Sequence, residues 1–361
     1  MEGLVMPPIQ EMFRGKRVWV SGHTGFKGSW LTEWLLQMGA IVHGYALEPD
    51  TTPSLFDLLG LRYRIGHEVA DIRNAALVRS SIQEFRPDYL FHLAAQPLVR
   101  RSYAFPVETY GTNVMGTIHV LESLREISHP CSAVVVTTDK VYENLESGRA
   151  YEEADPLGGR DPYSSSKAMA EIATAAYHNS YFQNGLVRIA CARAGNVIGG
   201  GDWAEDRIVP DAMRALDGAG IISVRNPAAV RPWQHVLEPL GGYLLLASKL
   251  GSGATCAESF NFGPREDSNR TVADLVTEIL KHRKGKWIDA SQPGALHEAK
   301  FLNLSIKKAD RVLHWRPVWG FETTVEKTVE WYQGVHAGMG ANGICNRQIN
   351  EYTLQANLLI P

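Results

Sequence analysis

The chain has 361 residues, longer than one core of typical size, which favours one large α/β unit or two lobes. Hydrophobic residues make up 45% and charged residues 21%, as in ordinary globular enzymes, and this composition excludes a disordered chain. The formal net charge of −3 gives no basic surplus, so we expect neither nucleic acid nor a membrane surface as a main partner.

After a loose lead-in over residues 1–15, short apolar runs alternate with amphipathic segments. Strands that alternate with helices of about 10–15 residues are typical of βαβ units. Nearly continuous apolar strands are typical of a parallel sheet covered on both faces. We therefore predict an α/β fold, with a Rossmann-like doubly wound parallel sheet over residues 16–199. Strands are expected over 16–20, 40–47, 67–72, 86–95, 131–139 and 186–196, and helices over 28–38, 107–126 and 165–179.

The pattern loosens after the glycines at 199–201. Residues 200–340 are expected to form mostly a smaller mixed α/β substrate lobe, interleaved with the first. Residues 341–361 have no clear periodicity and are predicted to be a surface tail. Within the lobe we expect a strand over 221–225 and helices over 236–250 and 271–282.

The four cysteines, Cys131, Cys191, Cys256 and Cys345, lie far apart and form no CxxC pair. Neither a disulfide framework nor a metal site is expected, and Cys131 and Cys191 beside predicted strands are interpreted as core thiols. No apolar run reaches the roughly 18 residues of a membrane span, and no secretory signal is recognised. We expect a cytoplasmic protein.

A glycine-rich turn over residues 22–28, Gly-His-Thr-Gly-Phe-Lys-Gly, follows the first strand and opens the first helix. Gly22 permits the tight turn, Gly25 lets backbone N–H groups approach a pyrophosphate, and Gly28 lets the helix pack on the strand. This context predicts dinucleotide binding rather than a structural turn.

The GxxGxxG spacing resembles the extended short-chain dehydrogenase/reductase superfamily. The resemblance implies a nicotinamide dinucleotide, NAD, whose adenine lies between Asp71 and Ile72. It implies that further cofactor contacts come from the glycine turn and from the ends of the fourth and fifth strands. These are Gly22, Thr24, Gly25, Phe26, Lys27 and Gly28, Leu93, Ala94, Ala95 and Gln96, and Thr137.

The choice between NAD and NADP stays open on local residues. NAD-binding members usually end the second strand with an acid that takes the ribose hydroxyls, but Tyr45 stands there, and Glu48 lies beyond the strand. Lys27 and His23 stand in the glycine turn, and without the acid a 2′-phosphate is repelled less strongly.

Tyr163 and Lys167 are four residues apart at the start of a predicted helix, so their side chains share one face. A phenol with a pKa near about 10 is a poor base at neutral pH. A nearby ammonium and the nicotinamide charge lower that pKa, which predicts a catalytic pair. Upstream, Thr138, Asp139 and Lys140 follow the fifth strand, at the end where ligands lie in parallel sheets.

The resemblance covers residues 15 to 317 and becomes more specific at the fifth strand. Nucleotide-sugar 4,6-dehydratases carry Thr-Asp-Glu there, and this chain has Thr138-Asp139-Lys140. With GHTGFKGSWL (22–31), RAGNVIGGGDWAEDRIVPD (193–211) and VRPWQHVLEPL (230–240), this is similar to the CDP-D-glucose 4,6-dehydratases. The resemblance implies a lyase that makes CDP-4-keto-6-deoxy-D-glucose, a precursor of 3,6-dideoxyhexoses in bacterial O-antigen lipopolysaccharide.

The resemblance also implies residue roles. Tyr163 takes the 4-hydroxyl proton while hydride leaves C4, Thr138 hydrogen-bonds the substrate, and Asp139 protonates the departing C6 hydroxyl. Relatives use a glutamate as the C5 base, and Lys140 stands in its place. A lysine is a base only when neutral, so Lys140 is either a deprotonated base or a charged stabiliser of the enolate.

A nucleotide-sugar diphosphate favours arginine forks. Arg231 matches the family's diphosphate arginine, Asn196 an asparagine that holds phosphate or sugar, and Arg101 an arginine near the sugar. Lys300 aligns with a family arginine at the phosphates, and Arg207 and the backbone near Val224 are expected on the cytidine side.

The two long helices over 107–126 and 164–179 form a dimer interface in many relatives, so a homodimer is expected, with a tetramer left open. The competing interpretations are another nucleotide-sugar 4,6-dehydratase, a 4-epimerase, and a non-catalytic dinucleotide-sensing protein. An epimerase needs neither a C6 acid nor a C5 base, so Asp139 and Lys140 speak against it.

Overall fold

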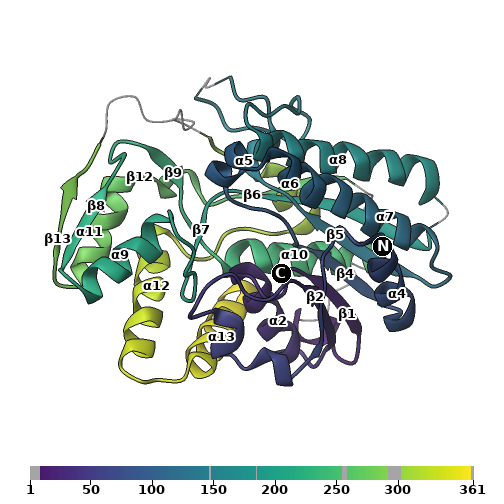
Figure 1. Ribbon diagram of the computed structural model, residues 1–361, viewed down its shortest axis with the longest axis horizontal. Helices are drawn as coiled ribbons and strands as arrows, with labels where there is room; N and C mark the ends of the chain where they lie inside the picture. Colours follow the sequence, from purple (N-terminus) through teal and green to yellow (C-terminus); the bar gives the residue numbers. More distant parts are fainter. Residues whose placement is uncertain (1–8, 146–147, 184, 254–257, 292–301, 359–361) are drawn as a thin grey trace.

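The computed structural model describes residues 9–145, 148–183, 185–253, 258–291 and 302–358. Its centre is a seven-stranded parallel sheet in the order β11-β6-β5-β4-β1-β2-β3 (Figure 1). The predicted Rossmann-like α/β fold is confirmed. The strands are β1 (Arg17–Ser21), β2 (Ile41–Ala46), β3 (Gly66–Val69), β4 (Tyr89–His92), β5 (Cys131–Val136), β6 (Val187–Ala194) and β11 (Ser259–Phe262).

Helices cover both faces of the sheet, because alternate residues of each strand point to opposite sides. Val18 and Val20 of β1 belong to the core beneath α2 and α10, whereas Trp19 between them packs with residues of α4 and α7. Cys131 and Cys191 are buried thiols, as predicted, and Cys256 lies outside the described residues. The covering helices are α2 (Phe26–Gln37), α4 (Ala75–Phe85), α7 (Gly116–Arg125), α8 (Pro162–Tyr181) and α10 (Leu237–Gly251).

The helix predicted as continuous over 107–126 is interrupted. Helix α6 (Pro106–Tyr110) runs into a π-helical turn, Gly111–Met115, before α7 begins. Apolar spacing does not reveal such a turn, since it adds one residue without changing which residues are apolar. The shorter helical segments include α3 (Leu55–Leu58), α5 (Val99–Ala104) and the 3-10 turns Leu61–Tyr63, Asp139–Val141 and Glu266–Ser268.

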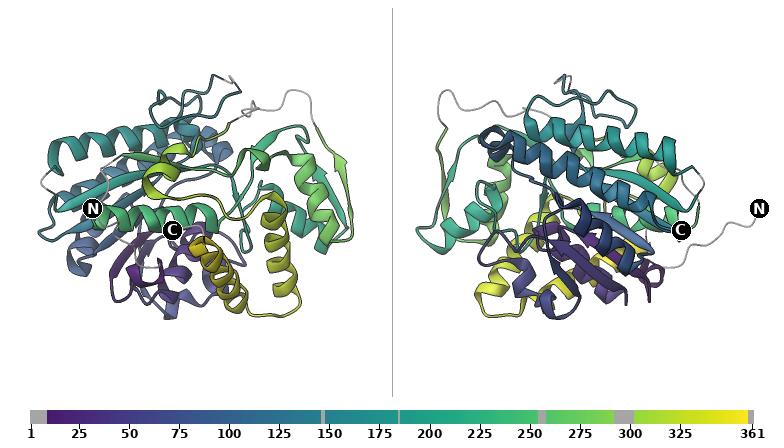
Figure 2. Two further views of the ribbon diagram at one scale, coloured as in Figure 1. Left: turned by 180° about the vertical axis from the view of Figure 1, so that it is seen from behind. Right: turned by 45° about the vertical axis from the view of Figure 1, so that its right-hand side comes forward.

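Smaller elements gather beside the carboxyl edge of the sheet, at the left of Figure 1 and at the right of the left-hand view in Figure 2. The predicted strand over 221–225 and helix over 271–282 are among them, but α10 and β11 return to the central sheet. The lobe contains β7 (Val197–Ile198), α9 (Ile208–Asp217), β8 (Ile221–Val224), β9 (Val230–Pro232), β10 (Gln234–His235), β12 (Asn269–Thr271), α11 (Val272–His282) and β13 (Lys286–Asp289). The chain then passes a π-turn, Ala309–Leu313, and enters α12 (Phe321–His336).

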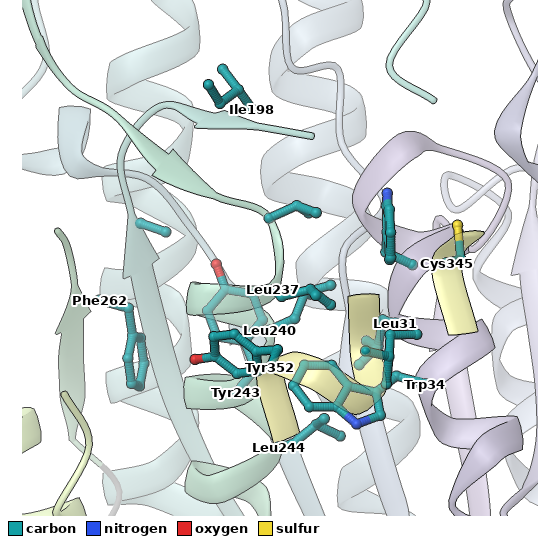
Figure 3. Close-up of a cluster of buried hydrophobic side chains, with 14 of the residues drawn as sticks. Leu31, Trp34, Ile198, Leu237, Leu240, Tyr243, Leu244, Phe262, Cys345 and Tyr352 are labelled. Atoms are coloured by element: carbon teal, nitrogen blue, oxygen red, sulfur yellow. The ribbon is translucent and has the colours of Figure 1, made fainter. Parts of the chain in front are cut away.

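The predicted surface tail over 341–361 is wrong for its described part. Residues Ala341–Leu358 form helix α13, which packs on α2 and α12. In Figure 3, Cys345 and Tyr352 lie among apolar side chains of α2 and α10. The many Asn and Gln residues of this segment hide its apolar stripe from sequence analysis. The lead-in is also partly ordered, because α1 (Ile9–Met12) is followed by the buried Phe13.

The buried carboxylate of Glu238 joins this C-terminal part to α10. Glu238 accepts hydrogen bonds from the backbone N–H groups of Val318 (3.0 and 3.1 Å) and Trp319 (2.6 Å) and from the Tyr352 hydroxyl (2.9 Å). One side chain, itself fully buried, thus accepts from three donors in two separate segments.

We expect Glu238→Ala to lower the free energy of unfolding by about 3 kcal/mol, because it strands these buried donors. Urea denaturation followed by circular dichroism measures the loss. The control is Glu326→Ala on α12, an exposed glutamate, which should change stability by less than about 0.5 kcal/mol. Equal stability of the two variants would contradict the prediction.

Candidate active site

A cavity of about 1690 Å³ lies between the carboxyl edge of the sheet and the second lobe. Every site residue predicted from the sequence lines it except Lys300, which lies outside the described residues. The structure thus brings the predicted cofactor, catalytic and substrate residues to one cavity. They are Gly22, Thr24–Gly28, Asp71, Ile72, Leu93–Gln96, Arg101, Thr137–Lys140, Tyr163, Lys167, Asn196, Arg207, Val224 and Arg231.

The glycine turn has room for a ligand at one of its glycines. Gly22 has a φ of +74°, and a Cβ there would lie 2.7 Å from the Ala94 nitrogen. A Cβ on Gly28 would lie 2.1 Å from the Gly22 oxygen. At Gly25, the N-cap of α2, the nearest such atom is 3.5 Å away. Packing therefore explains Gly22 and Gly28, while Gly25 leaves the helix N-terminus open to the cavity, as a dinucleotide pyrophosphate requires.

Lys27 adds a cation to this turn. Burial, and then the charge of Arg207, lower the pKa of Lys27 to about 7. Its Nζ lies 6.0 Å from the ring centroid of Tyr243. An amine so poorly solvated gains from a phosphate oxygen, so the residues of the turn fit a dinucleotide.

At the end of β2 the structure places Tyr45 where the acidic pattern would have a carboxylate, as the sequence predicted. Tyr45 is buried and its hydroxyl donates to the Asp71 carbonyl at 3.0 Å, so it offers no carboxylate to a ribose. Glu48 lines the cavity beyond β2 and is ion-paired with Arg62 at 2.5 Å. Glu48 is one of two carboxylates that follow β2 along the cavity, the other being Asp50.

The 3-10 turn after β5 holds Thr138, Asp139 and Lys140. The Thr138 hydroxyl donates to Asp139 Oδ1 at 2.9 Å, and Lys140 Nζ donates to the same oxygen at 2.9 Å. Burial lowers the pKa of Lys140, but the neighbouring Asp139 and Tyr163 outweigh this effect and leave the pKa above its ordinary value. The ion-pair geometry with Asp139 and the direction of this shift both favour the ammonium form of Lys140.

Tyr163 and Lys167 stand in the first turns of α8, whose N-terminus is capped by the Asp161 side chain. Burial raises the pKa of the Tyr163 phenol, and Lys140 opposes this effect more than any other cation. Lys167 was expected to act on the phenol, but its Nζ donates to the Val136 carbonyl at 3.0 Å. Proximity in space rather than spacing along the helix decides which lysine acts on Tyr163 most.

Sequence analysis missed Asn113, which lies in the π-helical turn. Its Oδ1 accepts from the Gln96 backbone N–H at 2.8 Å, and its Nδ2 donates to the Gln96 carbonyl and to Ser166 Oγ. Asn113 thus ties the cofactor strand end to α8. The π turn is the only local signal, because such turns concentrate at functional sites, and it cannot be read from the sequence.

The predicted substrate residues occupy the far side of the cavity. Asn196 Oδ1 accepts from Lys140 Nζ at 3.4 Å, Arg207 pairs with Asp202 at 2.8 Å, and Arg231 Nη1 donates to the Val230 carbonyl at 2.9 Å. Val224 is buried at the end of β8. Arg101 is half-exposed at the rim and pairs with Glu108 at 3.0 Å.

Two further searches concern metals and membranes. Across the described ranges, no group of three or more His, Cys, Asp and Glu side chains is arranged to hold a metal ion. In the same part of the chain, no helix has the length and apolar character needed to span a membrane. The cytoplasmic location stays a prediction.

The chain is similar in sequence to known nucleotide-sugar dehydratases. Residues 19–328 match the family model described as GDP-mannose 4,6 dehydratase. The chain is 45% identical over 352 residues to the CDP-glucose 4,6-dehydratase of Salmonella typhimurium, covering 95% of this chain and 98% of that protein.

Solved structures share the fold. The dTDP-glucose 4,6-dehydratase DesIV of Streptomyces venezuelae, solved with NAD bound, superposes with a TM-score of 0.74 at 25% identity, covering 90% of this chain and 99% of that one. The UDP-glucose 4-epimerase of Thermus thermophilus, also with NAD, has the same TM-score and identity and covers 88% and 99%. Dehydratases and epimerases therefore share this fold, and the fold alone does not separate them.

Proposed function

Because the chain belongs to the nucleotide-sugar 4,6-dehydratase family that includes the Salmonella CDP-glucose enzyme, we propose that it converts CDP-D-glucose to CDP-4-keto-6-deoxy-D-glucose and water, with NAD. The carrying observation is 45% identity over nearly the whole of both chains. The proposed catalytic residues Thr138, Asp139, Lys140 and Tyr163 meet in one cavity. The product is a precursor for deoxysugar synthesis, and the next enzyme in that synthesis must bind a sugar that carries a ketone at C4.

The acid and the amine after β5 favour a dehydratase over an epimerase. An epimerase removes and returns hydride at C4 and needs no group for C5 or C6. Asp139 and Lys140 are placed on a tight turn at the cavity, with side chains bonded to each other. Elimination of water across C5 and C6 needs one proton acceptor and one proton donor side by side, which this pair supplies.

Bound NAD would take hydride from C4 and later return it to C6, so no external reductant is consumed. The open N-terminus of α2 at Gly25 and the Lys27 amine would hold the pyrophosphate, and Lys167 the nicotinamide ribose. Glu48 beyond β2 would face the adenosine ribose, where a carboxylate disfavours a 2′-phosphate.

Tyr163 performs the first proton transfer. As a phenolate it accepts the proton of the sugar 4-hydroxyl while the hydride leaves C4, which gives the 4-ketone. Burial disfavours the phenolate, and the Lys140 ammonium and a hydrogen bond with Thr138 oppose that cost. Thr138 stands beside the phenol and is placed to bond the same sugar oxygen.

Asp139 and Lys140 carry out the elimination as one unit. Moving a single proton along their 2.9 Å hydrogen bond converts the ion pair into a neutral acid and a neutral amine. The Lys140 amine then removes the C5 proton made acidic by the ketone, and the Asp139 carboxyl protonates the C6 hydroxyl. Water leaves, and Lys140 returns the proton to C5 as hydride reaches C6. The 4-hydroxyl proton held by Tyr163 then passes to the Lys140 amine, which restores the phenolate and the ion pair. An ammonium in the resting site and a base in the reaction are thus compatible.

The nucleotide diphosphate is proposed to lie against Arg231, with Arg207 and the end of β8 near the cytidine. Arg231 lies close enough to Lys140 to lower the pKa of Lys140, which supports a diphosphate bound beside the reacting sugar. Asn196 contacts Lys140 and can bond the sugar or the adjoining phosphate. Arg101 at the rim would contact the sugar nucleotide, and Lys300 is proposed as a phosphate ligand.

A homodimer is proposed through the outer face of α6 and α8. Apolar side chains are exposed there, namely Val107 (84%), Met169 (49%) and Ile172 (58%). Small residues along α8 permit close helix approach. We expect Ile172→Glu to shift the protein from dimer to monomer in sedimentation velocity, because a buried charge opposes association. Leu354→Glu, at an equally exposed leucine of α13, should leave the dimer intact. A wild-type monomer would contradict the proposal.

The function is tested by incubating the purified protein with NAD⁺ and CDP-D-glucose and recording the alkaline absorbance of the 4-keto-6-deoxy sugar. dTDP-D-glucose and UDP-D-glucose are assayed in parallel. We expect product from CDP-D-glucose and no net NADH. Conversion of UDP-D-glucose to its 4-epimer would identify an epimerase, and tight NAD binding without turnover of any sugar would identify a dinucleotide sensor.

A further inference from the structure

A buried ion pair stands behind the cavity wall. Glu171 of α8 and Arg193 of β6 have side chains that are only 2% and 3% exposed, and neither lines the cavity. Arg193 Nε lies 2.9 Å from each carboxylate oxygen of Glu171. Burying two charges is costly unless every lone pair and proton is bonded, so the other partners of the pair are informative.

Ser259 and the Glu153 carbonyl are two of these partners, and the other two flank the catalytic turn. The Thr137 hydroxyl donates to Glu171 Oε1 at 2.5 Å, and Arg193 Nη1 donates to the Tyr142 hydroxyl at 2.6 Å. The Arg193 guanidinium also lies over the Tyr142 ring, 4.7 Å from its centroid. Thr137 and Tyr142 are the residues on either side of the segment 138–141. The pair therefore holds the catalytic turn at both of its ends.

The same ion pair also acts on the Tyr163–Lys167 part of the site, through helix α8. Lys167 and Glu171 are four residues apart on that helix. Burial lowers the pKa of Lys167 to about 8, and the Glu171 carboxylate opposes this effect. The Glu171 charge thus favours the ammonium form of Lys167, which the ribose of a bound cofactor requires.

We propose that Glu171 and Arg193 are positioning residues, which fix the turn carrying Thr138, Asp139 and Lys140 against the helix carrying Tyr163 and Lys167. The inference rests on the proposed function and adds two residues that touch neither substrate nor cofactor. The catalytic groups come from two separate elements, β5 and α8, and the ion pair bonds to residues beside both. A displacement of about 1 Å between such groups can lower a rate about 10²-fold.

The test is Glu171→Gln, which keeps the side-chain shape and removes the charge. We expect kcat for CDP-D-glucose to fall about 10²-fold while KM changes less than about threefold. We also expect the alkaline limb of the kcat profile to move to lower pH. The sign follows from Lys167, because loss of the carboxylate lowers its pKa further and the ammonium disappears at a lower pH. Glu171→Asp, which restores the charge, should return the limb toward its original pH.

A matched control separates positioning from stability. Glu33 of α2 is an equally buried carboxylate paired with Arg64 at 2.5 Å, and neither lines the cavity. Glu33→Gln should lose stability while kcat and the alkaline limb stay unchanged. The proposal would be overturned if Glu171→Gln kept the wild-type kcat and pH profile. It would also be overturned if Glu33→Gln lost as much kcat as Glu171→Gln.

If Glu171→Gln does not fold, Tyr142→Phe provides a second route. It removes the hydroxyl that accepts from Arg193 and leaves the ion pair in place, so kcat should fall about tenfold with an unmoved alkaline limb. Unchanged kcat there would also overturn the proposal. Wild-type turnover of CDP-D-glucose is measured in the same series. An inactive wild type would mean that the proposed function is wrong. An active wild type with equally active variants would mean that the positioning proposal is wrong.

Discussion

Tyr163→Phe is expected to lower kcat for CDP-D-glucose by about 10²–10⁴-fold, because it removes the group that accepts the 4-hydroxyl proton. The loss should come at the first chemical step. Rapid mixing of the NAD⁺-loaded variant with substrate should therefore show no rise in the near-ultraviolet absorbance of reduced nicotinamide. Binding of CDP-D-glucose, measured by calorimetry, should remain within about threefold of wild type, since the ring is kept.

The control for this variant is Tyr110→Phe. The Tyr110 hydroxyl is hydrogen-bonded to Ser165 Oγ at 2.7 Å, and Ser165 lies on α8, the helix that carries Tyr163. Tyr110 itself does not line the cavity. Wild-type kcat is expected there, and only the stability should change. A Tyr163→Phe enzyme that still forms reduced nicotinamide rapidly would assign the first proton transfer to another group.

Asp139→Asn is expected to separate the two halves of the reaction. An amide cannot protonate the C6 hydroxyl, so elimination should slow by about 10²–10⁴-fold while C4 oxidation continues. Reduced nicotinamide should then accumulate with a 4-keto sugar, which rapid quenching and mass spectrometry detect. C5 exchange in deuterated water reports on Lys140 independently of water loss, and Lys140→Ala should abolish it.

Asp155→Asn is the matched control, because Asp155 pairs with Arg149 and does not line the cavity. Its turnover should equal that of wild type. If Asp139→Asn eliminates water at the wild-type rate, the paired-proton mechanism is wrong. If Lys140→Ala retains C5 exchange, the amine takes no part in proton removal.

The motifs that bind phosphates and reacting groups were predictable because each is local. The glycine turn, the Tyr163–Lys167 spacing and the residues after the fifth strand are short segments whose geometry follows from one strand end and one helix start. A parallel sheet places such ends at a common edge, so the sequence already predicted that they would meet. Membership of the dehydratase family was likewise visible in the residues around Lys140.

Contacts between distant segments were not predictable. Asn113 acts through a π turn that leaves no trace in apolar spacing, and Glu171 and Arg193 are 22 residues apart on different elements. The C-terminal helix was missed because its apolar stripe only makes sense beside α2 and α10, where Glu238 and Tyr352 meet. A polar composition in a segment does not show which face a neighbour will cover.

The sequence by itself determined the α/β class, the dinucleotide turn and the Tyr163–Lys167 spacing, because each depends on patterns within a few residues, whereas the substrate residues followed from the family resemblance. Only the tertiary structure gives the direction of the Lys140 pKa, which burial lowers and the neighbouring Asp139 and Tyr163 raise above its ordinary value. It also decided which lysine acts most on the Tyr163 phenol. Electrostatic effects depend on distance in space and on the loss of water, and neither quantity is written in the spacing of residues along a chain.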